Sequence, residues 1–222
     1  MKLLIGTNNQ HKFKEFQSVL ITKEIKNLEI ITHSSLDIAN FEPIENANNL
    51  EGNALNKAKG FFEISGIPCI ADDTGLEIEA LNGAPGVYSA RFAGEPTNDF
   101  NNREKVLRLL ENFTVEKRIA RFRTVICLYG IKIDIEQNKL SQEDNQILFD
   151  NNIGYKFFSG VCNGSMSLDE RGKNGFGYDS IFIPDGYNKT FAELSSAEKN
   201  EISHRGRAID NLCHFLQNCN PI

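Results

Sequence analysis

The chain has 222 residues, of which 40% are hydrophobic and 24% charged, and its formal net charge is −6. These values are typical of a globular protein and exclude wholesale disorder, but they fit one large domain and two small lobes equally well. The negative charge argues against a general nucleic-acid binder, which gains affinity from excess Lys and Arg, yet it leaves room for a local basic site for one polyphosphate.

The cysteines indicate reduced thiols. They are odd in number and never form a C-x₂-C pair, so they favour neither a disulfide framework nor a zinc site; they are Cys69, Cys127, Cys162, Cys213 and Cys219. The N-terminus lacks a long apolar stretch, and no segment approaches the roughly 18 apolar residues of a membrane span. We therefore expect a cytoplasmic protein.

The first predicted elements are a strand, a loop and a helix. Lys2–Gly6 is a short apolar run, the loop is Thr7–Gln10, and apolar residues then recur at helical spacing. A loop entering a helix N-terminus favours an anion, and Lys12 would add a point charge for phosphate. The second Gly and the Lys-Ser/Thr pair of a Walker A loop are missing. Taken alone, these residues fit a helix cap followed by a surface lysine better than they fit a phosphate-binding site.

The next stretch leads from the N-terminal elements to a second helix. A strand is predicted at Glu29–Thr32, followed by an acidic, Asn-rich surface loop at Asp37–Asn49. Asn53 is predicted to cap a helix that ends near Gly66, because apolar residues follow it at the helical period. A strand at Ile67–Ala71 comes next.

Asp72-Asp73-Thr74-Gly75 is predicted to lie directly after this strand. Adjacent carboxylates at a strand end repel each other, so such a pair often shares a cation or moves a proton, and Mg²⁺ is the natural partner. The same residue types are ordinary turn formers, and without the rest of the chain the two interpretations are even.

Turn formers and a helix follow. Asn82–Gly86 is rich in Gly, Pro and Asn, and Thr97 is predicted to cap a helix. The residues predicted to share the buried side of that helix are Val106, Leu109, Leu110 and Phe113. Two longer strands are predicted at Ala120–Tyr129 and Tyr155–Val161. The polar stretch Ile131–Asn152 between them is interpreted as an extended excursion, with a short strand at Gln146–Phe149.

The C-terminal third combines a Gly-rich turn at Gly172–Gly177, a capping box from Ser195 to Glu198 and a final helix opened by Ser203. The residues that this helix is predicted to bury are Ile209, Leu212, Phe215 and Leu216. No internal repeat is recognised.

Two constellations in this third suggest a ligand. In Gly175–Asp179 the glycines would let a planar ligand approach the backbone, and Phe176 or Tyr178 could stack on a base, although both could equally be core residues. Lys199, His204 and Arg205, near the start of the last helix, could present donors to a ligand. A charged helix start exposed to water is the commoner case.

Taken in order, these segments resemble the inosine/xanthosine triphosphate pyrophosphatase family, often called Ham1-like, over nearly the whole chain. The matching motifs are Thr7–Lys12, Ala71–Leu76, Gly83–Arg91, Gly175–Asp179, Thr190–Leu194, Glu198–Asn200 and Ile202–Arg205. The resemblance implies an α/β fold with an elongated mixed β-sheet, flanking helices and two lobes around a central cleft. It further implies a single domain over residues 1–222 and a homodimer.

The resemblance also implies an activity. The chain would be a Mg²⁺-dependent enzyme that hydrolyses deaminated purine nucleotides (ITP, dITP, XTP, dXTP) to the monophosphate and pyrophosphate, and so removes them from the nucleotide pool. Asp73 would be the general base and would bind Mg²⁺ together with Glu45, with Asp72 beside it. The residues that would hold the triphosphate are Thr7, Asn8, Asn9, Gln10, His11 and Lys12.

Base recognition is implied at a second set of residues. Thr74 would touch the substrate, and the base pocket would be formed by Phe176, Gly177, Tyr178, Asp179, Lys199, His204 and Arg205. Donors aimed at a 6-oxo group would leave one donor unpaired against the 6-amino group of adenine. Buried unpaired donors are costly, so this arrangement can discriminate strongly.

The chain departs from the family pattern in a few places. Thr74 stands where Ser is usual, and Ser180 replaces the Pro that commonly follows the G-F-G-Y-D run. The acidic loop offers Glu42, Glu45 and Glu51 in place of the familiar paired Glu and Gly.

Two other functions remain open at this point. One is a pyrophosphatase for other modified nucleotides, and the other is a catalytically silent nucleotide-binding protein. The absence of the P-loop pattern disfavours a Walker-type NTPase.

Overall fold

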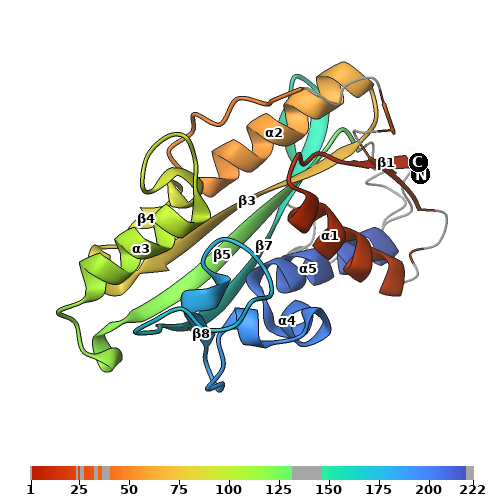
Figure 1. Ribbon diagram of the computed structural model, residues 1–222. Coiled ribbons are helices and arrows are strands. Elements are labelled where there is room, and N and C mark those ends of the chain that lie inside the picture. The colour runs from red at the N-terminus through yellow and green to blue at the C-terminus, as the bar shows by residue number, and fades with distance from the viewer. Residues whose placement is uncertain are drawn as a thin grey trace. The chain divides into compact units, whose positions relative to one another are not determined.

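A computed structural model describes residues 2–23, 25, 28–32, 35–36, 41–131 and 147–218. α-Helices and strands alternate from β1 to β3, and the chain ends with two successive helices, α4 and α5 (Figure 1). The α-helices are α1 (Gln10–Thr22), α2 (Leu50–Ser65), α3 (Asp99–Leu110), α4 (Ser196–Ile202) and α5 (His204–Asn218). The strands are β1 (Lys2–Ile5), β2 (Glu29–Thr32), β3 (Cys69–Ile78), β4 (Pro85–Gly86), β5 (Ile119–Tyr129), β6 (Leu148–Asp150), β7 (Ile153–Met166) and β8 (Phe182–Pro184). Short 3₁₀ turns are η2 (Glu79–Leu81), η3 (Ser89–Arg91), η4 (Val115–Lys117), η5 (Asp179–Ile181) and η6 (Phe191–Glu193).

The strands form one mixed sheet in the order β2-β1-β3-β5-β7-β6, with β4 paired to β3 and β8 paired to β7. Strand β1 runs parallel to β2 and β3, whereas the β3–β4, β6–β7 and β7–β8 pairs are antiparallel. The predicted fold class, a mixed sheet with flanking helices, is confirmed.

The chain divides into two compact units. The first takes its residues from Met1–Asp73, Val125–Ser159 and Ala208–Ile222, and the second from Thr74–Thr124 and Gly160–Arg207. Strands β3, β5 and β7 and helix α5 contribute residues to both units. The prediction of a single domain over residues 1–222 stays a prediction.

In the first unit, helices cover both faces of the sheet. Side chains of successive strand residues point to opposite faces. Leu3 and Ile5 of β1 accordingly pack in a cluster with apolar residues of α1 and α5, whereas Leu4 packs with Phe61 of α2 and Cys69. The α5 residues predicted to be buried, Ile209, Leu212, Phe215 and Leu216, all lie in this core.

In the second unit, β3, β5, β7 and α3 enclose an aromatic core. Leu76 and Ile78 of β3 pack with Val106 and Leu110 of α3, and the ring centroids of Phe122 and Phe182 lie 4.7 Å apart. Tyr178 also lies in this core, and its hydroxyl donates to the carbonyl of Ser89 at 2.8 Å. The interpretation of Tyr178 as a core residue is therefore confirmed.

Several predicted boundaries are confirmed. The strand Glu29–Thr32 is observed with the predicted bounds, and α2 ends at Ser65, next to Gly66, which caps it in the left-handed conformation, as predicted for an end near Gly66. The capping box of Ser195 and Glu198 is formed at the start of α4. Ser203 Oγ accepts from the N–H of Gly206 at 3.0 Å, as expected of a residue that opens α5.

Other boundaries were predicted wrongly. Helix α2 is capped by Asn49 and not by Asn53, and α3 by Asn98 and not by Thr97. Leu109 is 43% exposed, because it lies off the α3 face that buries Val106 and Leu110. For the two caps, several neighbouring Asn and Thr residues fit the sequence pattern of a helix start, and the pattern does not distinguish among them.

The excursion Ile131–Asn152 falls largely outside the described residues. Of the strand predicted at Gln146–Phe149, β6 covers Leu148 and Phe149, whereas Gln146 lies outside the description. Asn151 and Asn152 both have positive φ angles, 48° and 67°, and form the tight turn between β6 and β7.

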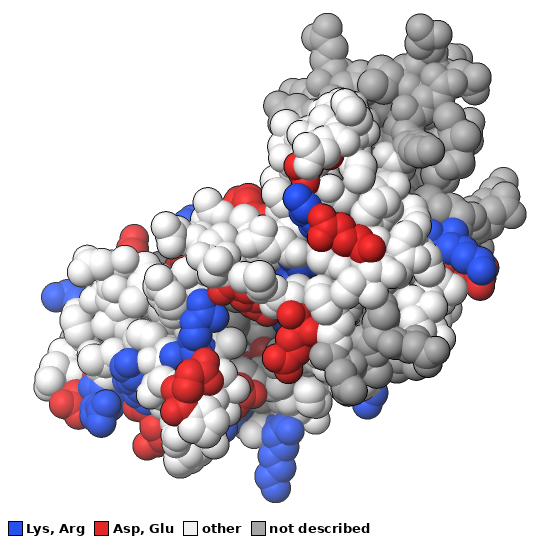
Figure 2. All heavy atoms as spheres, turned by 90° about the horizontal axis from the view of Figure 1, so that it is seen from above, with Lys and Arg blue, Asp and Glu red and all other residues white. Residues whose placement is uncertain are grey.

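The described helices include none that is long and apolar enough to cross a membrane. On the face shown in Figure 2, Lys and Arg side chains lie among Asp and Glu side chains. That face offers no broad basic surface of the kind that binds nucleic acid.

Candidate functional site

The first candidate site lies in the first unit, where β3 carries Asp72 and Asp73. Both residues were predicted to follow the strand, but β3 continues to Ile78, so they lie within it. Neighbouring strand residues point to opposite faces, which separates the two carboxylates. Asp72 contacts Lys12 of α1 at 3.0 Å, whereas Asp73 contacts Lys57 of α2 at 2.9 Å. The expected position of the two carboxylates at a strand end, and the alternative of a turn, were therefore wrong, whereas the expectation that a cation such as Mg²⁺ is bound here stays a prediction.

Lys57 links the two predicted metal ligands. Its Nζ lies 2.9 Å from Asp73 Oδ1, 3.0 Å from Glu45 Oε2 and 3.1 Å from the carbonyl oxygen of Asp72. Burial is the largest single influence and lowers the pKa of Lys57, but the attraction of Asp73, Glu45 and Asp72 outweighs it and raises the pKa above its usual 10.5. Lys57 is therefore a cation at neutral pH and cannot serve as the general base.

Asn53 fixes the other oxygen of Asp73. Its side chain, 1% exposed, donates to Asp73 Oδ2 at 3.1 Å and accepts from the N–H of Ala47 at 2.9 Å. The amide thus connects the carboxylate to the acidic loop that also carries Glu45. Two donors from α2, four residues apart, hold Asp73 in one orientation.

The predicted phosphate loop precedes α1 in the same unit. Asn9 caps the helix, and its Oδ1 accepts from the N–H groups of His11 and Lys12 at 2.9 Å and 3.2 Å. These two N–H groups, expected to face an anion, are therefore engaged within the loop, although the helix start remains electropositive. Thr7 Oγ1 accepts from the N–H of Asn9, and Asn8 Nδ2 donates to the carbonyl of Phe41 at 3.0 Å.

This loop presents most of its predicted phosphate-binding side chains to the surface. Asn8, Asn9, Gln10 and His11 are exposed, whereas Thr7 and Lys12 are half-buried. Lys12 thus pairs with Asp72 on one face of β3, whereas Lys57 forms a charge network with Asp73 and Glu45 on the other face and also donates to the backbone carbonyl of Asp72.

The carboxylates of this network suit Mg²⁺. Glu45 and Asp73 offer hard oxygen ligands, and Mg²⁺ in proteins is commonly bound by one or two carboxylates, with water and substrate phosphates completing the shell. Among the residues that the structure describes, no group of three or more His, Cys, Asp and Glu forms a full protein cage for a metal. A two-carboxylate site is the chemistry that these donors fit.

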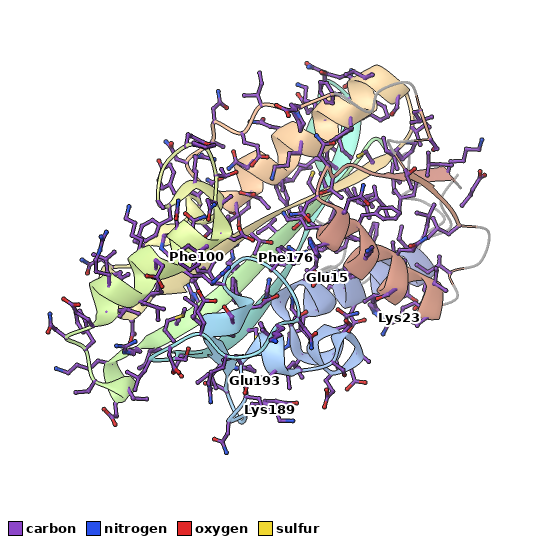
Figure 3. The ribbon with its side chains drawn as sticks, viewed as in Figure 1. Glu15, Lys23, Phe100, Phe176, Lys189 and Glu193 are labelled. Atoms are coloured by element: carbon purple, nitrogen blue, oxygen red, sulfur yellow. The ribbon has the colours of Figure 1, made fainter. Side chains whose placement is uncertain are left out.

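The second candidate site lies in the second unit, around Phe176. This residue lies on the loop that precedes η5, next to α3, which carries Phe100 (Figure 3). The Phe176 ring lies 5.1 Å from Lys199 Nζ and 5.7 Å from Arg205 Cζ. An aromatic ring beside two cations attracts them and offers a surface for a planar ligand.

Asp179 connects this loop to α4. Its Oδ2 accepts from the N–H of Phe176 at 2.9 Å and from Lys199 Nζ at 2.7 Å, and both charged side chains are buried. A buried ion pair of this kind is costly to break, because the remaining charge loses its partner. The pair therefore fixes Lys199 beside Phe176.

Arg205 and His204 complete the second site. Arg205 Nη2 donates to Thr74 Oγ1 at 3.1 Å, and the Thr74 oxygen lies 2.6 Å from Thr124 Oγ1. His204 is 3% exposed and stacks on Phe122, with ring centroids 4.5 Å apart and planes at 17°. The predicted base-recognition residues and Thr74 thus gather within one unit, with His204 set among aromatic rings.

Comparison with known proteins shows the family to which the chain belongs. A sequence model of the Ham1 family matches residues 3–215. The dITP/XTP pyrophosphatase of Flavobacterium psychrophilum is 43% identical over 98% of this chain and 100% of its own length. That of Porphyromonas gingivalis is 42% identical over 97% of both chains.

Solved structures agree with this assignment. The Ham1 protein of Staphylococcus aureus superposes with a TM-score of 0.76 at 35% identity, covering 98% of both chains. A HAM1 protein of Coxiella burnetii gives a TM-score of 0.77 at 34% identity, covering 97% of this chain and 98% of its own. The resemblance proposed from the sequence is therefore confirmed, and the chain belongs to the Ham1 family.

Proposed function

We propose that this protein is a pyrophosphatase that hydrolyses deaminated purine nucleoside triphosphates, of the dITP and XTP class, to the monophosphate and pyrophosphate. The relatives that match it over nearly their full length are named for that activity. The observation that carries the proposal is the placement of Asp73, which Lys57 and Asn53 hold in one orientation next to Glu45.

In the proposed reaction, Asp73 orients and deprotonates a water molecule that attacks the α-phosphorus. The P–O bond to the pyrophosphate group breaks, and the proton of the water passes to the carboxylate. Lys12, at the start of α1, would contribute positive charge toward the phosphates. Glu45 and Asp73 would hold Mg²⁺, which when bound neutralises charge on the phosphate oxygens.

The base would be recognised by the residues around Phe176. Phe176 would stack on the purine, while Lys199 and Arg205 would offer donors to its 6-oxo group. Against adenine one such donor would face an amino group and remain unpaired, which disfavours binding. The preference for deaminated purines is thus proposed to reside in the second unit.

A substrate panel tests this proposal. Pyrophosphate release is measured with ITP, dITP, XTP, ATP, GTP and dUTP in the presence and absence of MgCl₂. Fast turnover of the first three and dependence on Mg²⁺ are expected. Preference for dUTP would favour another modified-nucleotide pyrophosphatase, and binding of ITP without turnover would favour a silent binding protein.

Asp73→Asn is the matching variant. We expect it to fold, because the amide keeps the size of the side chain, and to lose pyrophosphate release by about a thousandfold or more, because an amide is no base. Activity within a few-fold of wild type would remove Asp73 from the mechanism.

We further propose that the enzyme acts in the cytoplasm as a homodimer. The free, buried thiols of Cys69, Cys127, Cys162 and Cys213 suit a reducing compartment. Sedimentation velocity at several protein concentrations tests the dimer, and a single monomeric species throughout would contradict it.

A further inference from the structure

Helix α3 holds the loop that carries Phe176 by both backbone groups of one residue. The N–H of Gly177 donates to Asp99 Oδ2 at 2.8 Å, and the carbonyl of Gly177 accepts from Arg103 Nη1 at 3.0 Å. Asp99 and Arg103 are four residues apart and therefore lie on the same side of α3. One helix thus fixes the position of Gly177 with an anion on one side and a cation on the other.

The guanidinium of Arg103 also contacts Glu170, near the start of the loop, and Glu170 in turn binds Ser180 near its end. Arg103 Nε lies 2.9 Å from Glu170 Oε1, while Glu170 Oε2 accepts from Ser180 Oγ at 3.0 Å. Ser180 also accepts, through its carbonyl, from the N–H of Arg171 at 2.8 Å. The planar fork of an arginine donates to two such partners from separate nitrogens in a fixed geometry, whereas a lysine offers a single nitrogen at the end of a flexible chain. Arg103 therefore joins the loop tip to the point where the loop leaves and rejoins the sheet.

The two hydrogen bonds from Asp99 and Arg103 to Gly177 are called the clamp below. Phe176 directly precedes Gly177, so the position of the Phe176 ring depends on this clamp. The ring lies 5.1 Å from Lys199 Nζ and 5.7 Å from Arg205 Cζ. On the other side, Asp179 holds the N–H of Phe176. If Gly177 moved, the ring would shift relative to both cations.

We propose that Asp99 and Arg103 are positioning residues that set the distance between Phe176 and the cations, and thereby the affinity and selectivity for the base. The proposal rests on the function proposed above, in which Phe176 contacts the purine. Neither residue has to touch the nucleotide. Loss of the clamp weakens binding of ITP in the ground state and the transition state alike, so it acts mainly on KM.

The kinetic test compares Arg103→Met with Arg103→Lys, and Asp99→Ala with Asp99→Asn. Losing one hydrogen bond to a charged group favours displaced loop positions by roughly tenfold, and binding of ITP must then restore the bound position, so we expect KM for ITP to rise up to about tenfold in Arg103→Met and Asp99→Ala. We expect kcat to stay within about threefold, and the ITP-to-ATP ratio of kcat/KM to fall, because only adenine lacks the 6-oxo group that Lys199 and Arg205 are proposed to recognise. Asp99→Asn keeps an oxygen acceptor for Gly177 and should recover much of KM.

Arg103→Lys should recover little, because lysine lacks the fork. Arg108→Met, an exposed arginine of the same helix, is the control and should leave KM unchanged. A fall in kcat with unchanged KM, or full activity in Arg103→Met, would overturn the proposal.

A second readout does not depend on catalysis. The chain contains no Trp, so Phe176→Trp introduces a single tryptophan at the loop, which can be excited selectively in the presence of the tyrosines. In this background Arg103→Met should increase quenching by acrylamide about twofold or more, and Arg108→Met should not. Equal quenching in Phe176→Trp alone and in its combinations with Arg103→Met and with Arg108→Met would contradict the proposed clamp, even if ITP is the substrate.

Hydrogen exchange covers the case in which the tryptophan variant fails to fold. The amide of Gly177 should exchange faster in Asp99→Ala than in the otherwise wild-type chain, and unchanged exchange would contradict the clamp. If wild type shows no turnover of any nucleotide, the proposed function fails while the quenching and exchange results still decide whether the clamp exists.

Discussion

Lys57 connects Asp73 and Glu45, so its removal should change stability and metal affinity in opposite directions. In Lys57→Met the Asp73 side chain, 10% exposed, loses its counterion, and we expect the free energy of unfolding to fall by about 3 kcal/mol. The two carboxylates would then repel each other and bind Mg²⁺ more tightly without nucleotide. Urea unfolding and calorimetric titration with MgCl₂ measure the two effects.

The stability effect of Lys57 should depend on pH with a defined sign. Because its pKa is raised in the folded state, its contribution is fully present below about pH 10.5 and is lost as the pH rises further. The difference between wild type and Lys57→Met should therefore be constant near neutral pH. Lys59→Met, which removes a more exposed lysine of the same helix, is the control. Unchanged Mg²⁺ affinity in Lys57→Met would show that Lys57 does not compete with a cation.

At the scale of single residues, the sequence indicated which residues belong to the candidate site better than it indicated which side chains they contact. Asp73 and Glu45 were identified by resemblance, but Lys57 and Asn53 were missed, because a lysine and an asparagine on a helix usually face water. A signal was present: the buried face of α2 consists of Leu50, Asn53, Ala54, Lys57, Ala58 and Phe61. Two polar residues at core-facing positions of the helical period indicate partners in the interior.

At the scale of elements, polar residues inside β3 caused its C-terminal end to be predicted too early. The strand was predicted to end at Ala71, because Asp72–Gly75 has the composition of a turn. It continues because α1 and α2, on opposite faces of the sheet, supply Lys12 and Lys57 to the two carboxylates. Such compensation comes from residues distant in sequence, which a local pattern cannot contain.

Helices α4 and α5 approach each other closely at Gly206, and this can be tested. Replacing an exposed helical glycine by alanine usually stabilises a protein by about 1 kcal/mol. A Cβ at Gly206, however, would overlap the carbonyl oxygen of Asn200, which belongs to the backbone of α4 and cannot rotate away. We therefore expect Gly206→Ala to lose about 3 kcal/mol, measured by urea unfolding.

Gly66→Ala provides the comparison. Gly66 has a φ of 65°, but a Cβ there would meet no atom within 4 Å. Its substitution should cost only the backbone term of about 1 kcal/mol. A gain of stability in Gly206→Ala would mean that α4 and α5 lie farther apart than described.

At the scale of the whole molecule, the pattern of elements was predictable because most helices and strands carry strong hydrophobic periods. The bounds of the two units were not predictable, since β3, β5 and β7 continue through both without a break in composition, and two lobes were implied only by the family resemblance. Opening either unit would disturb strands that it shares with the other. We therefore predict that the two units unfold together.

Thiol labelling tests this prediction. Burial raises the pKa of Cys162, in the second unit, and of Cys213, in the first, to about 11 each, so both should react slowly near pH 7.5. If unfolding exposes both units at once, a maleimide should modify the two cysteines at the same rate in moderate urea, as measured by mass spectrometry of their peptides. The fully unfolded chain gives the reference rate for each thiol. Labelling of Cys162 at least tenfold faster than Cys213, after this correction, would show that the second unit opens alone, because a shared opening cannot favour one thiol.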